Sequence, residues 1–193
     1  MGSLNCVVIY GSVRSNRQGI KAARFVVTKL RERGHDVNFV DAKDYDLPLL
    51  DRMYKEYDAG TAPEPMEKIA GMLRDAEAIV LVSGEYNHSV PPALKNLLDH
   101  FQTEYFWKPA GIATYSGGAF AGARVAVHLR AILGELGMVT LPSMFAVSRV
   151  GKAFDDEGRP EDEAYHRRIG KFIDELEWYG AALGAAREKG TPY

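Results

Sequence analysis

The sequence predicts an α/β protein, a three-layer α/β/α sandwich built on a parallel five-stranded sheet. Short apolar runs alternate along the chain with amphipathic stretches of helical period, an order typical of parallel sheets covered by helices on both faces. Residues 78–82 are continuously apolar, as in a central strand buried on both sides. No linker, repeat or low-complexity tract divides the chain, so residues 1–193 are expected to form one domain.

The first part of the chain predicts a βαβ unit. Residues 4–10 form an apolar run, and residues 20–33 follow with the spacing of an amphipathic helix. Gly34 stands where a helix C-cap glycine belongs. Residues 36–41 alternate between polar and apolar positions and predict the second strand.

A long connection is expected after the second strand. Residues 42–63 lack clear periodicity and carry several Asp, Gly and Pro residues. The expected apolar anchors of this connection are Leu47, Leu49 and Leu50. Pro65 then opens a helix that extends to about Arg74, because proline is best tolerated in the first helical turn.

The rest of the chain predicts three more strands and three more helices. The strands are predicted over residues 78–82, 110–115 and 140–147. The helices are predicted over residues 93–101, 121–136 and 161–186. Pro142 places the last strand at an edge of the sheet, because proline cannot donate a ladder hydrogen bond.

Composition excludes several classes of protein. The net charge of −2 argues against a general nucleic-acid binder or a protein that docks on anionic membranes. No apolar run approaches the ~20 residues of a membrane span. The amino terminus lacks the pattern of a secretory signal, and Cys6 is the single cysteine. We therefore expect a cytoplasmic protein without membrane or nucleic-acid partners.

Three predicted strands end in segments typical of ligand-binding loops, at residues 11–19, 83–89 and 116–118. In open α/β sheets, free backbone N–H groups and helix N-termini bind anions at this edge. The first loop adds Arg14 and Arg17 to small polar residues, which suits a phosphate monoester. The alternative interpretation is an ordinary strand-to-helix turn with solvated arginines.

The three loops could share one ligand. If the strand order is 2-1-3-4-5, the strands that carry them are neighbours, and their carboxyl ends line one crevice. The second loop offers the aromatic ring of Tyr86 and the side-chain amide of Asn87. The third offers Gly117 and Gly118, whose N–H groups can approach a planar ring closely. A phosphate site, an aromatic wall and amide donors together indicate a flavin mononucleotide (FMN).

The same segments resemble a known family, the NADPH-dependent FMN reductases of the flavodoxin-like fold. The resemblance rests on Gly11-Ser12-Val13-Arg14 with Arg17, on the run from Glu85 to Asp99, and on Ser116-Gly117-Gly118. It extends from about residue 4 to residue 146 and implies a five-stranded parallel sheet of order 2-1-3-4-5. It also implies FMN as cofactor, NADPH or NADH as hydride donor to flavin N5, and a homodimer or homotetramer. The implied electron acceptor is a small molecule such as FMN, a quinone, an azo compound or a metal oxyanion.

The resemblance also implies which residues contact FMN. The phosphate would be held by Ser12, Arg14, Asn16, Arg17 and Gln18. The ribityl chain and ring would be bordered by Glu85, Tyr86, Asn87 and His88. The pyrimidine edge would be met by Ser116, Gly117 and Gly118. We expect no catalytic side chain and no metal site, because the flavin carries the chemistry.

One position departs from the family pattern. The family usually has proline before the Glu-Tyr-Asn element, where this chain has Gly84. Because proline stiffens a turn, we expect Gly84 to leave this one more mobile.

Two other functions remain open from the sequence. A flavodoxin-like electron carrier would bind FMN without oxidising NAD(P)H itself, but the near-neutral charge and the loop arginines weigh against it. A dinucleotide dehydrogenase is disfavoured, because residues 11–14 do not complete a Gly-x-Gly-x-x-Gly fingerprint.

Several single side chains also have two interpretations. Glu85 is either a catalytic carboxylate or a structural acceptor for a neighbouring loop, and we favour the second. His88 is either a proton donor or a residue that holds its loop through a hydrogen bond, and again we favour the second. The three consecutive aromatic residues are either core or self-association residues, or they cap the flavin site. They are Tyr105, Phe106 and Trp107.

Overall fold

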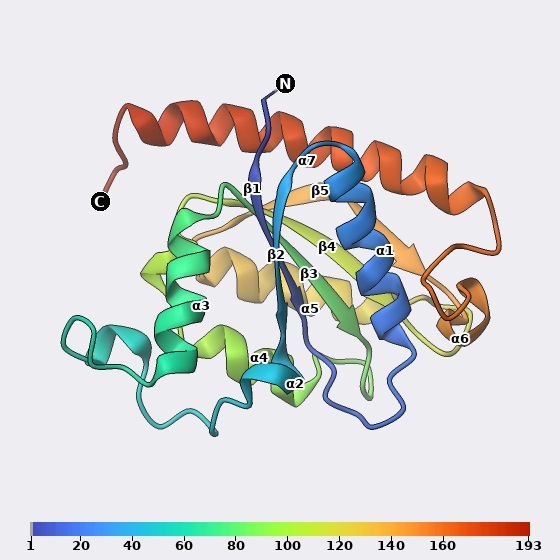
Figure 1. Ribbon diagram of the computed structural model, residues 1–193, viewed down its shortest axis with the longest axis horizontal. Coiled ribbons are helices and arrows are strands. Elements are labelled where there is room, and N and C mark those ends of the chain that lie inside the picture. Colours follow the sequence, from blue (N-terminus) through green and yellow to red (C-terminus); the bar gives the residue numbers. More distant parts are fainter. Residues whose placement is uncertain (1) are drawn as a thin grey trace.

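The computed structural model describes residues 2–193 and shows a parallel sheet between two layers of helices (Figure 1). The strand order is β2-β1-β3-β4-β5, which confirms the prediction. The strands are β1 (Asn5–Tyr10), β2 (Asp36–Asp41), β3 (Ala78–Gly84), β4 (Pro109–Tyr115) and β5 (Val139–Val147). Every adjacent pair is parallel, and β5 with its Pro142 is an edge strand, as predicted.

Five long helices cover the sheet, and the sequence predicts each of them. They are α1 (Gly19–Glu32), α3 (Glu64–Asp75), α4 (Pro92–Asp99), α5 (Ala123–Glu135) and α7 (Ala164–Glu188). The sequence did not predict the short helices α2 (Ala42–Tyr45) and α6 (Val150–Ala153) or the 3₁₀ turns η1 (Tyr54–Glu56) and η2 (Thr103–Tyr105). Three or four residues are too few to show a helical period.

The two faces of the sheet carry separate cores. Helices α1 and α7 cover one face, and α3, α4 and α5 cover the other (Figure 1). Successive strand residues alternate between them: Val8 and Val80 belong to the first core, Val7 and Ile79 to the second. Burial on both faces explains why β3 is apolar throughout its central residues.

The long connection after β2 is held by polar contacts and by Leu47, but not by Leu49 and Leu50. Leu49 is 85% exposed and Leu50 is 41% exposed, so the prediction that they anchor the segment is wrong. Only Leu47 packs against the core. The side chain of Asn96 on α4 fixes the segment, because its Nδ2 donates to the Pro48 carbonyl (2.8 Å) and its Oδ1 accepts from the Leu50 N–H (2.9 Å).

The aromatic segment before β4 lies at the amino ends of the strands. Tyr105 is fully buried, so the core interpretation is confirmed for this residue. Phe106 and Trp107 are half-buried and stack edge-on against Tyr193, with ring centroids 6.0 and 4.8 Å away. Because Trp107 precedes β4, these rings lie at the opposite edge of the sheet from the three predicted loops. They do not cap the crevice of their own chain.

Lys108 is buried beside these rings, and we expect it to make stability depend on pH. Its Nζ donates to the carbonyls of Leu73 and Arg74 at the end of α3. Desolvation, followed by the charge of Arg187, lowers the pKa of Lys108 from 10.5 to about 8. Between pH 8 and pH 10.5, Lys108 therefore keeps its proton in the unfolded chain but has released it in the native protein. The free energy of unfolding should therefore rise by up to about 3 kcal/mol from pH 8 to pH 10.5.

Urea unfolding measured from pH 7 to pH 10.5 checks this prediction. The variant Lys108→Met should lack the rise, since it has no group that titrates in this window at this position. The same rise in the variant and the unmodified protein would show that another group is responsible.

Within residues 2–193, no helix combines the length and the apolar character that crossing a bilayer requires.

Candidate functional site

The loops that follow four strands gather at the carboxyl edge of the sheet, in the lower right part of Figure 1. Three of them are the predicted loops after β1, β3 and β4. The fourth, residues 148–152 after β5, was not predicted as part of a site. All four lie at the edge where parallel sheets bind ligands.

The loop after β1 presents a row of backbone donors. Within the described chain, the N–H groups of residues 12–19 donate to no protein acceptor. They lead into the N-terminus of α1, a helix with no acidic residue in its first turn. Unpaired N–H groups and the positive end of a helix dipole favour an anion here. Arg14, Asn16 and Gln18 line the cavity described below, and the Gln18 amide donates to Asn16 Oδ1 (2.9 Å).

Arg17 has a bracing role that the sequence did not reveal. Its Nη1 donates to Asp41 Oδ1 (2.5 Å) at the end of β2 and to the Ser12 carbonyl (2.9 Å). The guanidinium also lies 5.3 Å from the centroid of the Tyr10 ring. Asp41 is only 3% exposed, so its charge depends on this pair. Arg17 therefore fixes the loop, and it also lines the cavity described below.

Beneath the loop lies a cluster of hydroxyl groups. Ser12 is buried, and its Oγ lies 2.9 Å from the Tyr86 hydroxyl, which ties the first loop to the second. The Tyr115 hydroxyl donates to that of Tyr10 (3.4 Å). Burial raises the pKa of both Tyr10 and Tyr115, Tyr115 far above its usual value, so both phenols stay neutral.

The Tyr115 ring lies close to two glycines, Gly19 and Gly84, and leaves no room for a side chain at either. A Cβ on Gly19 would lie 2.0 Å from the ring, and a Cβ on Gly84 would lie 3.0 Å from it. Gly84 is the last residue of β3 and pairs with Tyr115. The departure from the family's proline thus has a packing reason, because a side chain at this position would press on Tyr115.

The second loop closes as a tight turn over residues 86–89. Tyr86 and Ser89 exchange both backbone hydrogen bonds (3.0 and 2.9 Å), and Asn87 and His88 between them have φ of 49° and 67°. Positive φ at both central residues is the signature of a type I′ turn. Ser89 Oγ lies 2.9 Å from His128 Nδ1 on α5. His128, and not His88, holds this turn, since the exposed His88 ring makes no hydrogen bond within residues 2–193.

Glu85 caps a neighbouring helix. Its Oε2 accepts from the N–H groups of Arg124 (2.9 Å) and Val125 (3.1 Å) in the first turn of α5. The cap residue of α5 is Gly122, which offers no side chain of its own. The interpretation of Glu85 as a structural acceptor is confirmed. With the His128 contact, the second loop is tied to α5 at points about one helical turn apart.

Replacing Glu85 by alanine should lower the free energy of unfolding by about 1–2 kcal/mol, because two helical donors and a favourable dipole contact are lost. Glu85→Gln keeps an acceptor and should lose less. Urea unfolding of the two variants checks this order. If both unfold like the unmodified protein, the capping interaction has no energetic role.

The third loop is open and rich in backbone donors. Gly117 and Gly118 are exposed, and a Cβ on either would meet nothing within 4 Å. Their N–H groups have no acceptor among residues 2–193, and Ser116 Oγ donates to the Gly118 carbonyl (3.1 Å). The chain after β5 fastens onto this loop, because the N–H groups of Arg149 and Val150 donate to the carbonyls of Gly118 (2.9 Å) and Ser116 (3.0 Å).

A cavity of about 570 Å³ opens between the first, third and fourth loops. Its charged lining residues are Arg14, Arg17, Arg149 and Lys152, and no carboxylate of the described chain lines it. Gln18, Gly19, Tyr115 and Gly117 contribute to its wall.

Arg149 and Lys152 were missed because the segment after β5 has the composition of an ordinary charged loop. The rule that applies to the other three strands, that a loop at the carboxyl end lines the crevice, could have found them.

The described residues fit FMN. The donor row at residues 12–19 and the cationic cavity suit its phosphate, and the open glycine pair leaves room for a flat ring. The Tyr86 turn stands between these two features along the sheet, since β3 lies between β1 and β4.

Comparisons with known proteins agree with this geometry. Residues 4–152 match the family described as NADPH-dependent FMN reductase. A quinone reductase of Escherichia coli (strain K12) is 34% identical over 134 residues, 67% of this chain and 69% of that protein. An NADPH:quinone oxidoreductase of Arabidopsis thaliana is 30% identical over 188 residues, 93% of each chain.

A solved structure shows the same fold. The flavoenzyme NAD(P)H:(acceptor) oxidoreductase FerB of Paracoccus denitrificans superposes with a TM-score of 0.71 at 22% identity, covering 90% of this chain and 97% of its own. The matched family spans most of the chain, including all the loops at the carboxyl edge. The chain belongs to the NADPH-dependent FMN reductase family and is a flavin-dependent NAD(P)H oxidoreductase.

Proposed function

We propose that this chain holds FMN at the carboxyl edge of its sheet and uses NADPH to reduce a small quinone. The observation that supports this most strongly is the row of unpaired N–H groups at residues 12–19. Among residues 2–193, this row opens onto a cavity with four cationic side chains and no carboxylate. Two relatives that reduce quinones by name support the choice of acceptor. A related protein named FMN-dependent NADPH-azoreductase makes azo compounds the second class to test.

The residues of the site bind and orient the cofactor. When bound, FMN would supply the redox chemistry, the transfer of a hydride between the nicotinamide and the acceptor. Arg14, Asn16 and Gln18 would hold the phosphate together with the N–H groups of the loop. The Tyr86 turn would border the ring, and the N–H groups of Gly117 and Gly118 would face its pyrimidine edge. Those donors are preorganised, because the glycine loop is fastened by the chain after β5.

We further propose a homo-oligomer in the cytoplasm. Phe120, two residues after the glycine pair, is 69% exposed, and Val127 on α5 is 67% exposed. We propose that these exposed apolar side chains contribute to the contact between copies of the chain. The single Cys6 is a buried free thiol, which is compatible with a reducing compartment.

Quinone-dependent oxidation of NADPH tests the proposed acceptor. With the FMN-loaded protein and NADPH in anaerobic buffer, benzoquinone should be consumed with one NADPH oxidised per quinone. An azo dye and free FMN are compared under the same conditions. Turnover of the azo dye or of FMN without turnover of benzoquinone would contradict the quinone assignment.

Binding of FMN and riboflavin tests the phosphate loop. Arg14→Gln should weaken FMN binding by about tenfold and leave riboflavin binding unchanged, because only FMN carries the phosphate. Arg24→Gln, an exposed position on α1 outside the loop, is the matched control. Flavin fluorescence titration gives both affinities. Equal loss for FMN and riboflavin would show that Arg14 does not contact the phosphate.

A further inference from the structure

We propose that Arg149 and Lys152 form a second anion subsite that binds the 2′-phosphate of NADPH and so selects NADPH over NADH. The inference rests on the proposed function, because it names how the same site recognises its hydride donor. Within residues 2–193, neither Arg149 nor Lys152 forms an ion pair, and the cavity that both line contains no carboxylate.

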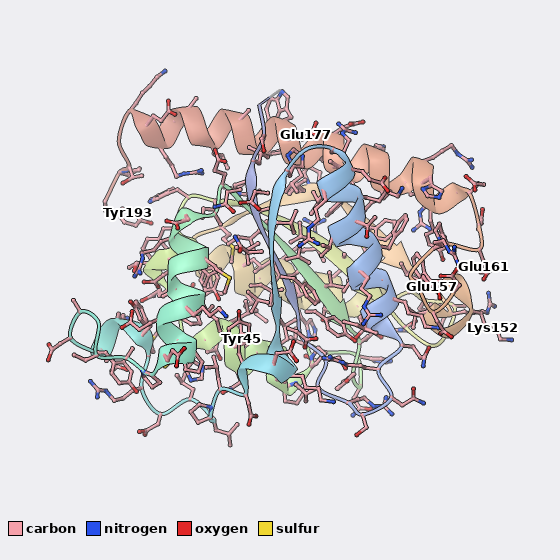
Figure 2. All side chains as sticks on the ribbon, viewed as in Figure 1. Tyr45, Lys152, Glu157, Glu161, Glu177 and Tyr193 are labelled. Atoms are coloured by element: carbon pink, nitrogen blue, oxygen red, sulfur yellow. The ribbon has the colours of Figure 1, made fainter. Side chains whose placement is uncertain are left out.

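The acidic residues near Lys152 are paired elsewhere or, like Glu161, do not line the cavity. Figure 2 shows Lys152 on the same side of the molecule as Glu157 and Glu161. The Glu157 carboxylate pairs with Arg159 (3.0 Å), and Asp156 pairs with Lys21 (2.7 Å). The positive charge of the turn that contains Arg149 and Lys152 is therefore available to a ligand.

This turn is built into the fold. Its backbone is fastened to the third loop through the Gly118 and Ser116 carbonyls, and the Lys152 N–H donates to the Arg149 carbonyl (2.8 Å). Arg149 has φ of 45°, a left-handed conformation that costs a non-glycine residue free energy and persists only where the surroundings hold it. The side chains at 149 and 152 thus start from fixed positions on one wall of the cavity.

The first loop already provides for the FMN phosphate. Its donors are the N–H groups of residues 12–19 and Arg14, which follow β1. Residues 149–152 follow β5 and meet the first loop at Gln18, where a Cβ on Gly151 would lie 3.8 Å from Gln18 Cγ. A phosphate held by the N–H row and Arg14 has its charge balanced without Arg149 and Lys152, so this second pair of cations is left for a second anion.

The 2′-phosphate of NADPH matches this second subsite. As a phosphate monoester it carries a charge of roughly −1.5 to −2 near pH 7, which two cations balance. Arg149 and Lys152 are both exposed at the rim of the cavity, where the adenosine end of a dinucleotide would lie while its nicotinamide is near the ring. NADH lacks the group, so these contacts would favour NADPH alone.

Binding of two adenosine nucleotides to the FMN-loaded protein tests this subsite without turnover. Adenosine 2′,5′-bisphosphate should bind at least about tenfold more tightly than AMP, because it adds charge-assisted hydrogen bonds to the 2′-phosphate. The double variant Arg149→Asn/Lys152→Gln should bind both equally. Asparagine is chosen because it tolerates the left-handed conformation of residue 149. The control Arg167→Gln/Lys171→Gln removes the same charge from exposed positions on α7 and should keep the preference.

Three results would overturn the proposal. The first is no preference for the bisphosphate in the unmodified protein. The second is a preference that survives in the double variant or is lost equally in the control. The third is a loss of FMN affinity in the double variant as large as its loss of bisphosphate affinity, which would assign both cations to the FMN phosphate. Failure of the proposed function gives a different result, because a protein that fails to reduce quinones can still distinguish the two nucleotides.

Discussion

Replacing Arg17 by alanine is expected to lower the free energy of unfolding by about 3 kcal/mol and to weaken FMN binding. The substitution leaves the buried Asp41 carboxylate without its cation and frees the Ser12 carbonyl to which Arg17 donates. An uncompensated buried charge is costly, whereas the same pair at the surface contributes little. The loop that presents the N–H groups would lose its brace to β2, so stability and FMN affinity should fall together.

A second ion pair of equal length provides the control. Lys95 Nζ lies 2.5 Å from Asp99 Oδ2, the same distance as in the Arg17–Asp41 pair, but the Lys95 side chain is 46% exposed. Lys95→Ala should change the free energy of unfolding by less than about 0.5 kcal/mol. Adding Asp41→Asn to Arg17→Ala should recover part of the loss, since it removes the stranded charge. Urea unfolding that shows similar effects for Arg17→Ala and Lys95→Ala would refute the bracing role.

Replacing Gly19 by alanine should be about as damaging, with a loss of about 3 kcal/mol from overpacking. The new Cβ would lie 2.0 Å from Tyr115 Cζ, so ring or helix must move. Little room is left for the ring toward β3, since even a Cβ on Gly84 would lie only 3.0 Å from it. Movement of α1 would displace the donor row at its N-terminus, and FMN affinity should decrease as well.

Two further variants separate this clash from a general effect of alanine. Gly71 lies inside α3, where an added Cβ would meet nothing within 4 Å, so Gly71→Ala should stabilise the protein by about 0.5–1 kcal/mol. Combining Gly19→Ala with Tyr115→Leu should restore part of the loss by making room. Thermal unfolding measures the stability of Gly19→Ala, of Gly71→Ala and of the double variant. A Gly19→Ala protein as stable as the unmodified one would mean that the Tyr115 ring does not exclude a side chain at position 19.

Much of the fold could be predicted because it depends on local periodicity. Residues 36–41 form a strand with the predicted bounds, and the apolar run at 78–82 forms the first part of β3. The predicted order of strands then brings the loops after β1, β3 and β4 to one edge. Side-chain anchors are harder to predict. Leu49 and Leu50 look like anchors by composition, but the contacts of Asn96 decide how that segment lies.

The parts of the site that escaped prediction depend on contacts between distant residues. Arg17 and Asp41 are separated by 24 positions, and Ser89 and His128 by 39. The conflict between a side chain at Gly19 and the Tyr115 ring likewise exists only once β4 and α1 are packed together.

Arg149 escaped prediction for a similar reason. It belongs to the site because the chain after β5 is fastened to the glycine loop, a contact between segments that are far apart in the sequence. Its left-handed backbone conformation has no local signature, since arginine rarely adopts it and neither neighbour is a glycine.

The most direct test of the central claim is the absorption spectrum of the FMN-loaded protein before and after NADPH is added without oxygen. We expect FMN to remain bound through gel filtration and its visible band to bleach within seconds of the addition. A protein that retains FMN but whose band NADPH leaves unchanged would be an electron carrier and would contradict the reductase assignment. A protein that binds no FMN would contradict the role of the loop at residues 12–19 itself.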